Sequence, residues 1–383
     1  MNHFNRPSSD KKKILMLFPG PRYHVGSLFQ RRLEKLSAWF RGSLITISDE
    51  EVNTVYGDFS LLAHDEPKPR SWPATVRMFR LALVQVKQAK EAKDPFDLIV
   101  TYDPLKIGLM ALLLSKISGV PYAVEVNGDF YAEGNYLDVN SKLKKFLVKR
   151  KLLATQWLVL SLSRGIKKLF SAQLSQATYL KNKLVQTYPD YIDLSIFNRK
   201  SSQDNKVILF VGFPYYLKGV DLLVDAFNIV NKEFPEWRLH ILGWFQDMAP
   251  VDQALTTNPN IHYKRPVYFE EMPEVMSSAD IFVLPSRTEA MGRVLLEAAA
   301  AGVARIGSNA GGIPEVVNHG VDGLIFESGD VISLTQALRR LMGDPDYRHE
   351  LIANATNSLE GKFSEGQYLE HTRLFYESVI ESA

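Results

Sequence analysis

Short apolar runs alternate with stretches of helical periodicity along most of this chain. Four runs in the first half are bounded by Pro, Gly or Asp, as is typical of buried parallel strands: Ile14–Phe18, Leu44–Ile47, Asp97–Tyr102 and Ala123–Asn127. Helical periodicity separates them near residues 26–40, 73–92 and 106–118. A further strand and helix are expected at Leu169–Gln173 and Ala177–Leu184. This alternation predicts βαβ units around a mainly parallel sheet.

A second series of the same kind follows the polar segment YPDYIDLSIFNRKSSQDNK, which is typical of an interdomain link. Its expected strands are Val207–Val211, Arg238–Leu242, Ile261–Lys264, Ile281–Leu284, Ala304–Gly307 and Gly323–Phe326. Its expected helices lie near 219–233, 271–278, 291–301, 313–318 and 331–342. The fold class is therefore α/β, with two doubly wound domains, 1–198 and 199–364, facing each other across a cleft. A last helical segment, 365–383, is expected to pack back onto the first domain.

Composition narrows the class of protein. A chain of 383 residues favours two domains, and a formal net charge of +2 gives no reason to expect a nucleic-acid partner. Cysteine is absent from the sequence, which excludes disulfides and thiol chemistry and is compatible with a cytoplasmic location. The apolar run that follows the basic N-terminal residues is shorter than the ~7–15 residues of a signal-peptide core. No uncharged apolar stretch approaches the ~20 residues that span a bilayer.

Candidate chemistry gathers in RTEAMGRVLLEAAAAG, residues 287–302. Gly292 stands where a helix should begin, so the N–H groups of Arg293 and Val294 can face an anion. Glu289 precedes that helix and Glu297 lies about a turn inside it, among apolar residues. A carboxylate in apolar surroundings needs a partner, which is either another part of the fold or a ligand. Its two oxygens suit a vicinal diol such as a ribose, although Glu297 could also be a surface residue of an Ala-rich helix.

Several other chemistries lack their sequence patterns. No G-x-G-x-x-G follows the first strand and no G-x-x-x-x-G-K-[ST] occurs, which argues against a nicotinamide dehydrogenase and a nucleoside triphosphatase. The eight histidines form no H-x-x-x-H pair, which argues against a dedicated zinc site. We therefore expect neither a metal nor an organic cofactor.

Residues 285–329 resemble the donor-site region of the retaining glycosyltransferases of family 4, which have the GT-B fold. The resemblance is carried by Glu289 and Glu297 in E-x7-E spacing around Gly292, then by EAAAAGVARIGSNAGGIPEVV and GVDGLIFESGD. The segment VILFVGFPYYLKGVDLLVDAF (207–227) is similar to the family's first strand of the second domain, with Lys-Gly before a helix. Looser similarities extend over the first half. The resemblance as a whole implies a GT-B enzyme of the hexosyltransferase type that takes a nucleotide-diphosphate sugar as co-substrate.

The resemblance also implies roles for residues at matching positions. Glu297 would bind the donor ribose, Glu289 the hydroxyls of the transferred sugar, and Lys218 the leaving diphosphate. The helix start would surround the diphosphate through Met291, Gly292, Arg293 and Val294, and the backbone from Arg265 to Val267 would border the base. Gly26, after the first strand, would let the first domain approach the diphosphate. Asn127, Gly128 and Asp129 would face the acceptor.

Two positions depart from the family pattern. Phe213 stands where relatives have an arginine that pairs with the lysine on the diphosphate, so Arg287 or Arg293 would have to supply that charge. Asn127 stands where many relatives have histidine, and an amide cannot act as a base at neutral pH. The front-face mechanism that the resemblance implies tolerates this change, because the leaving phosphate oxygen takes the acceptor's proton.

The stretch 141–170 holds nine Lys or Arg and no acidic residue. On a helical wheel an apolar face that includes Phe146, Leu147 and Trp157 is flanked by lysines, as suits the surface of an anionic membrane. The alternative is a half-buried helix with a solvated basic rim. We expect a cytoplasmic protein that is peripheral on the inner face of the membrane.

The sequence thus predicts transfer of a sugar, with retained configuration, to a hydroxyl of a glycan or lipid-linked acceptor. The cleft would close about a hinge near residues 190–205 and at the start of the last helix. Two rivals stay open. A nucleotide-sugar epimerase can share the two-domain architecture, and a non-catalytic nucleotide-sugar-binding protein would account for Phe213 and Asn127.

Overall fold

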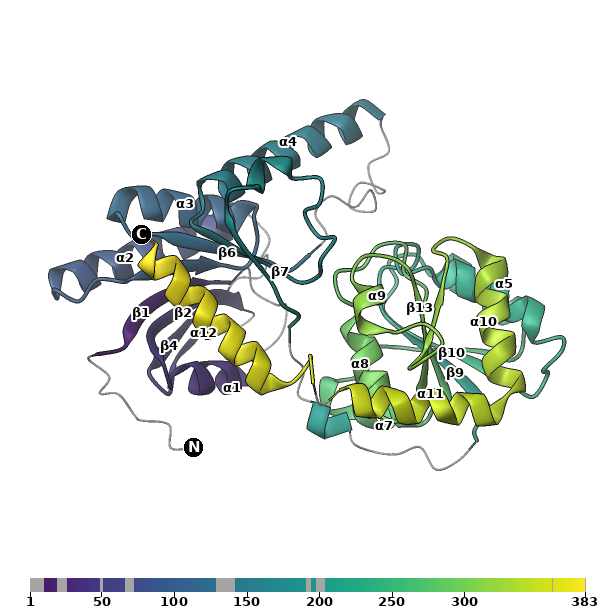
Figure 1. Ribbon diagram of the computed structural model, residues 1–383. Helices are drawn as coiled ribbons and strands as arrows, with labels where there is room; N and C mark the ends of the chain where they lie inside the picture. Colours follow the sequence, from purple (N-terminus) through teal and green to yellow (C-terminus); the bar gives the residue numbers. More distant parts are fainter. Residues whose placement is uncertain are drawn as a thin grey trace.

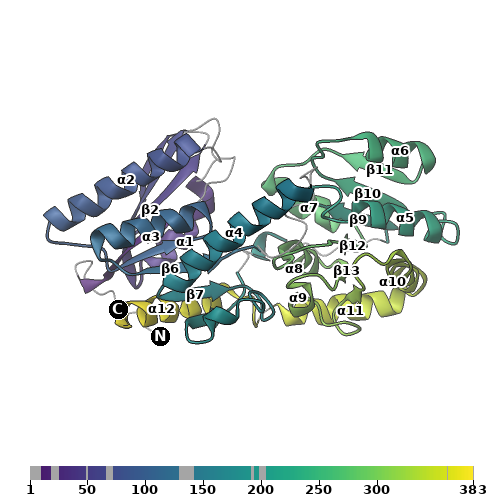
Figure 2. The ribbon, with the colours of Figure 1, turned by 90° about the horizontal axis from the view of Figure 1, so that it is seen from above.

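The computed structural model describes residues 10–18, 26–48, 51–65, 72–128, 142–190, 194–197, 204–359 and 361–382. They form two α/β domains, each built on one sheet, as Figures 1 and 2 show from two directions. Ten of the strands lie where the apolar runs predict them, including all six of the second series.

The first domain is built on an eight-stranded sheet in the order β3-β4-β2-β1-β5-β6-β7-β8. Only β3 runs antiparallel to its neighbour. The strands are β1 Lys12–Leu17, β2 Phe40–Ser48, β3 Val52–Tyr56, β4 Phe59–Asp65, β5 Leu98–Thr101, β6 Tyr122–Val126, β7 Gly165–Lys168 and β8 Leu184–Thr187. The helices are α1 Gly26–Leu36, α2 Trp72–Glu91, α3 Lys106–Ser118 and α4 Lys142–Leu162.

Both faces of this sheet are buried, because successive side chains point to opposite sides. Leu15 and Leu17 belong to the core under α2, α3 and α4. Ile14 and Met16 belong to the core on the other face, under α1 and the C-terminal helix. This two-sided burial is why the strands read as continuous apolar runs.

The second domain has a six-stranded parallel sheet in the order β11-β10-β9-β12-β13-β14. Its strands are β9 Val207–Val211, β10 Arg238–Leu242, β11 Ile261–Lys264, β12 Ile281–Leu284, β13 Ala304–Ser308 and β14 Leu324–Phe326. Its helices are α5 Val220–Val230, α6 Ala249–Thr257, α7 Met272–Ser277, α8 Arg293–Ala300, α9 Ile313–Val316, α10 Val331–Gly343 and α11 Pro345–Ser358. The strand order reverses between β9 and β12, and ligands of such sheets bind at that point, outside the carboxyl ends of the strands.

The last helix, α12 Glu365–Glu381, packs on the first domain rather than on the second, against α1, β5, β6 and β7 (Figure 1). Leu369, Phe375, Tyr376 and Val379 are buried there. The chain therefore crosses between the domains a second time, after α11.

The prediction of a strand and a helix within residues 169–184 is wrong. The sheet pairs Gly165–Lys168 instead, and the region 177–184 holds a short 3-10 helix, Thr178–Leu180, followed by β8. Leu169 and Phe170 are apolar because they pack into a core of the second domain. Burial alone does not distinguish a strand from such an interdomain contact.

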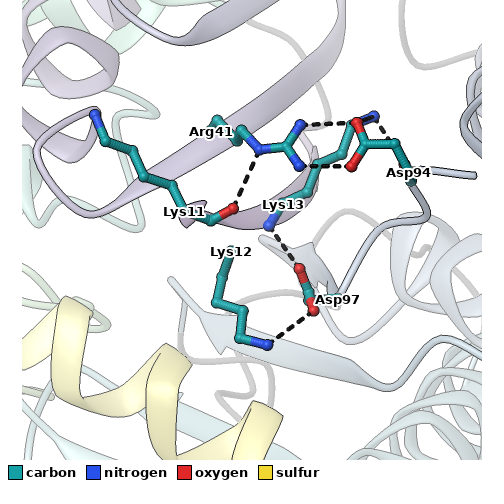
Figure 3. A network of polar contacts seen from close by, with 6 residues as sticks. All are labelled: Lys11, Lys12, Lys13, Arg41, Asp94 and Asp97. Carbon is teal, nitrogen blue, oxygen red and sulfur yellow. Dashed lines mark hydrogen bonds and ion pairs between the residues drawn. The ribbon is translucent and has the colours of Figure 1, made fainter. Parts of the chain in front are cut away.

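The basic residues at the start of β1 are neutralised within the fold (Figure 3). Lys13 binds Asp94 through its ammonium, at 2.8 Å, and Asp97 through its backbone N–H. Arg41 from β2 adds two hydrogen bonds to the Asp94 carboxylate, at 2.5 and 2.8 Å. Arg41, and then Lys13, hold the pKa of Asp94 well below its ordinary value. These contacts tie the amino ends of β1 and β2 to the turn before β5.

Among the helices of the described ranges, none is both long enough and apolar enough to cross a membrane.

Candidate functional site

The loops after β9 and β12 meet at the point where the second sheet reverses its strand order. The loop after β9 carries Lys218, and the loop after β12 carries Glu289 and leads into α8. Gly219 allows these two loops to touch. A Cβ atom at Gly219 would lie 1.9 Å from the carbonyl oxygen of Pro285, and the residue has φ +69°. Glycine is therefore required at 219, directly after the lysine.

Lys218 and Glu289, which the resemblance placed in one site, form an ion pair. The Lys218 Nζ donates to Glu289 Oε2 at 2.6 Å, and both side chains are largely buried. The hydroxyl of Ser286 donates to the same oxygen at 3.1 Å, and the backbone N–H of Ala290 donates to Oε1 at 3.1 Å. The carboxylate is thus fixed in position. An ammonium carries three N–H donors, so Lys218 can bind a second anion while it holds Glu289.

The two glycines before α9 pack against the backbone of this loop. The backbone N–H of Gly312 donates to the Ala290 carbonyl at 3.0 Å. A Cβ atom at Gly311 would lie 1.8 Å from the Glu289 carbonyl oxygen, and one at Gly312 would lie 2.4 Å from the Ala290 carbonyl oxygen. The glycines of NAGGIP therefore let the chain after β13 touch the loop that holds Glu289.

Helix α8 begins at the edge of the same loop. Its N-cap is Gly292, with φ +78°, so no side chain caps the helix. The N–H groups of Arg293 and Val294 are at its first two positions, where a helix offers no acceptor. The positive end of the helix is therefore available to an anion, as the sequence predicts.

Glu297 is buried in α8, with 8% of its surface exposed. Its carboxylate receives no hydrogen bond from any residue of the described chain. Burial raises the pKa of Glu297 above its ordinary value, and the nearby Arg293 offsets part of that rise. A buried carboxyl without a donor is costly unless a ligand supplies one. The reading of Glu297 as a surface residue is therefore wrong.

The structure distinguishes between Arg287 and Arg293, the two arginines that could replace the one that relatives have at position 213. Phe213 itself is 60% exposed at the end of β9 and carries no charge. Arg287 donates two hydrogen bonds of 2.7 Å to Asp221 and stacks on Tyr216, 3.9 Å from the ring centre. Arg293 is exposed and makes no hydrogen bond to the described residues through its side chain. Arg293 is therefore the cation that is free to meet a diphosphate.

On the first domain, Asn127 follows β6 at the carboxyl edge of the sheet. Its Oδ1 lies 3.5 Å from the Nζ of Lys167, a fully buried lysine of β7. Lys167 also binds Asp190. Burial would raise the pKa of Asp190, but Lys167, with Arg293 of the second domain and Arg32 adding to it, lowers the pKa overall. Charged groups of both domains therefore act on the same carboxylate.

Lys167, Asp190 and Gln173 were not predicted from the sequence as site residues. Gln173 is buried and donates from Nε2 to the carbonyls of Val126 and Gly128, each at 2.9 Å, which fixes the loop that contains Asn127. No local signal marks Lys167, because β7 has the sequence GIKK and only the fold shows which of its two lysines is buried.

The other predicted site residues occupy varied positions. Met291 is buried in the core, so only its backbone can face a ligand. Arg265 is exposed and Val267 partly buried, in the loop after β11. Gly26 is the first residue of α1 rather than part of a loop. Asp129 lies outside the described residues.

A metal site requires several ligating side chains close together. Within the described ranges, no group of three or more His, Asp or Glu side chains is placed to hold a metal ion.

Comparisons with known proteins relate the sequence to glycosyltransferases. The family model "Glycosyl transferases group 1" matches residues 192–358. The capsular polysaccharide biosynthesis glycosyltransferase CapM of Staphylococcus aureus is 28% identical over 192 residues, which cover 48% of this chain and 49% of CapM. The chain thus spans about half the length of the curated relatives it matches.

Solved structures match over nearly the whole chain. Sucrose-phosphate synthase from Thermosynechococcus elongatus has a TM-score of 0.78 at 16% identity, covering 97% of this chain and all of that one. HepE of Anabaena, solved in complex with UDP-glucose, has a TM-score of 0.69 at 15% identity, covering 96% and 99%. At these identities the likeness shows the fold, which is GT-B.

Proposed function

We propose that the whole protein is a retaining glycosyltransferase, as the match of residues 192–358 to the family model of the glycosyl transferases of group 1 supports. It takes a sugar from a nucleotide-diphosphate donor and attaches it to a hydroxyl of a glycan or lipid-linked acceptor. The donor binds where the loops after β9 and β12 meet, and the acceptor approaches from the side of Asn127 and Gly128.

The observation that carries this proposal is the carboxyl of Glu297, which has no hydrogen-bond partner among the described residues and lies in α8 near its uncapped start. A diphosphate on the N–H groups of Arg293 and Val294 would place the nucleoside within reach of Glu297. Two ribose hydroxyls can then donate to the two carboxylate oxygens. Binding the donor removes the cost of burying this group, so the site is most stable when a diol occupies it.

The chain's own residues are suited to stabilising the departing diphosphate. Lys218, Arg293 and the N-terminus of α8 together supply positive charge on one side of the scissile bond. The acceptor oxygen bonds to the anomeric carbon on the face from which the diphosphate leaves. The bond from that carbon to the phosphate oxygen breaks, and the acceptor's proton passes to this oxygen. We include no metal ion, because Lys218, Arg293 and the start of α8 already place positive charge beside the diphosphate.

Glu289 and Asn127 position the sugar rather than transfer protons. The Glu289 carboxylate is fixed by Lys218, Ser286 and Ala290, so it can accept hydrogen bonds from sugar hydroxyls in a constant orientation. Lys167 lies next to the Asn127 oxygen, so the amide N–H groups of Asn127 can donate to a sugar hydroxyl.

The test is donor binding by the full chain and by the variant Glu297→Gln. A panel of uridine-, guanosine- and adenosine-diphosphate sugars identifies the donor by thermal shift, and calorimetry then gives its affinity. We expect the variant to lose about tenfold or more, since a hydrogen bond to a charged group contributes ~1.5–3 kcal/mol. Glu350→Gln, an exposed residue of α11, is the matched control. Equal affinity of Glu297→Gln and the wild-type protein would overturn the site.

Turnover assays distinguish a transferase from the two alternative functions, an epimerase and a binding protein. A transferase needs acceptor for net conversion and hydrolyses the donor slowly without it. An epimerase converts the sugar nucleotide alone, and a binding protein does neither.

For the acceptor, we propose that α4 brings the cleft to an anionic membrane that holds a lipid-linked substrate. Phe146, Leu147 and Trp157 are 54%, 57% and 52% exposed, so the apolar face of this helix is turned to solvent. Six Lys or Arg and no acidic residue lie on the same helix. Figure 2 shows α4 reaching from the first domain towards the second. The apolar face would enter the interface while the lysines meet lipid phosphates.

Sedimentation with vesicles tests this placement. We expect the protein to bind phosphatidylcholine vesicles that contain phosphatidylglycerol but not vesicles of phosphatidylcholine alone, and Phe146→Ser with Trp157→Ser to abolish binding. The control pair Val55→Ser and Leu374→Ser removes two other exposed apolar residues, on β3 and α12, and should bind as the wild-type protein does. Binding that survives the first pair and falls with the second would refute the role of α4.

A further inference from the structure

A cavity of about 310 Å³ lies far from the donor site, at the amino ends of β6, β7 and β8. Its walls are the C-terminal ends of α3 and α4 and the turns that enter these strands. Three cations line it, Lys116, Arg164 and Lys183, together with several serines. Proposed sugar transfer uses none of them.

The three cations come from three different elements and converge without a carboxylate. No Asp or Glu is among the residues that line the cavity. The Nζ of Lys183 donates to the carbonyl of Ser163 at 2.8 Å, which fixes it at the wall with two N–H groups unused. Burial, and then the charge of Arg164, lower the pKa of Lys183. The site therefore concentrates positive charge that its own residues do not neutralise.

The negative C-terminal ends of two helices neutralise only part of this positive charge. Helix α3 ends at Ser118 and α4 at Leu162, and each C-terminus carries roughly half a negative charge. Together they offset about one of the three positive charges. A surplus of about two remains, which matches a phosphate monoester at neutral pH.

Exposed apolar side chains lie on the two helices whose ends line the cavity. Leu113 and Ile117 of α3 are 53% and 63% exposed, and Leu158 and Leu162 of α4 are 37% and 46% exposed. Leu162 itself lines the cavity. Exposed apolar side chains beside a cationic pocket suit a ligand with a phosphate at one end and hydrocarbon at the other.

We propose that the cavity between the ends of α3 and α4 binds a phosphate monoester, held by Lys116, Arg164 and Lys183. Charge-assisted hydrogen bonds from an ammonium or guanidinium to phosphate are the strongest such contacts available. The phosphate belongs either to a lipid headgroup or to a small soluble ester. This assignment depends neither on sugar transfer nor on the apolar face of α4 around Phe146.

Calorimetry with inorganic phosphate and the full chain tests whether the cavity binds phosphate, which both sources have in common. We expect one site, and a loss of at least tenfold in affinity in the triple variant Lys116→Gln, Arg164→Gln, Lys183→Gln, since each charged contact contributes ~1.5–3 kcal/mol. The control triple Lys35→Gln, Lys90→Gln, Lys232→Gln makes the same change of charge at exposed lysines outside the cavity. The charge-preserving triple Lys116→Arg, Arg164→Lys, Lys183→Arg should retain binding and shows that the fold tolerates changes at these positions.

Vesicles distinguish the two sources of the phosphate. Phosphatidylcholine vesicles with phosphatidic acid present a phosphate monoester on a lipid. Retention that is lost in the cavity triple but not in the control triple supports a lipid headgroup. Binding of inorganic phosphate that depends on the cavity, without such retention, supports a soluble ester. If the cavity triple and the control triple bind phosphate and vesicles equally, the proposal is wrong.

Discussion

At the residue scale, Arg287 and Arg293 lie six positions apart beside one helix start, yet their surroundings differ. Arg287 is engaged by Asp221 and by the Tyr216 carbonyl, at 2.6–2.7 Å. Arg293 makes no hydrogen bond through its side chain to the described residues and lies near Asp190 and the buried Glu297. An arginine that already holds a structural carboxylate cannot also approach a diphosphate without losing that contact.

We therefore predict that Arg293→Gln weakens binding of a nucleoside diphosphate by about tenfold or more, which corresponds to one charged hydrogen bond. Arg287→Gln should mainly lower the free energy of unfolding, because it removes the partner of Asp221. Calorimetry with the nucleoside diphosphate and urea denaturation measure the two effects. The reverse pattern, with affinity lost only in Arg287→Gln, would assign the diphosphate to the other arginine.

At the scale of elements, α12 is attached to the first sheet through buried polar contacts as well as apolar ones. The hydroxyl of Tyr376 donates to Glu125 Oε1 at 2.6 Å, and Arg32 approaches the same oxygen at 3.4 Å. Glu125 is 1% exposed on β6. Its charge is acceptable in that position only while these donors remain.

We predict that Tyr376→Phe lowers the free energy of unfolding by about 1–3 kcal/mol, the usual cost of leaving a buried group without its partner. Urea denaturation provides the measurement. Tyr268→Phe is the control, because Tyr268 is 81% exposed and its loss should change stability by no more than ~0.5 kcal/mol. A Tyr376→Phe variant as stable as the wild-type protein would show that Arg32 alone suffices for Glu125.

Elements also show how far the sequence could predict this molecule. The strands of the second domain were found because each is apolar on both faces and bounded by turn residues, so local pattern and tertiary burial agree. Leu169 and Phe170 have the same pattern, but the second domain covers them, and no local signal carries that information. The hairpin of β3 and β4 was missed because alternate residues of β3 are exposed and its pattern is weak.

The donor side of the site was predicted residue by residue, since Lys218, Glu289 and Glu297 lie on loops and a helix whose order along the chain is distinctive. Asn127 was also predicted, but Lys167 and Asp190, which form a cluster with it, were not. The members of this cluster come from three segments, and only the fold brings them together.

At the scale of the whole molecule, Phe170 couples the two domains. It follows β7 in the first domain, yet it belongs to the core around Leu295 and Ile313. A Cβ atom added at Gly312 would lie 3.1 Å from its ring. The neighbouring Ser171 donates its backbone N–H to Glu315 across the same boundary.

We predict that Phe170→Ala removes part of this coupling, so that the two domains unfold at more widely separated temperatures in scanning calorimetry. Truncation of a buried Phe costs about 3–5 kcal/mol in a core. Phe245→Ala, inside the second domain's other core, is the control and should lower the transition of that domain alone. Identical thermograms for Phe170→Ala and the wild-type protein would mean that other contacts couple the domains.

The return of α12 to the first domain has a geometrical consequence. Two separate lengths of backbone join the same pair of bodies, one before β9 and one between α11 and α12. A body fastened at a single point can swivel in any direction, whereas one fastened at two points turns only about the line through them. We predict that opening and closing of the two domains is therefore a rotation about this single line.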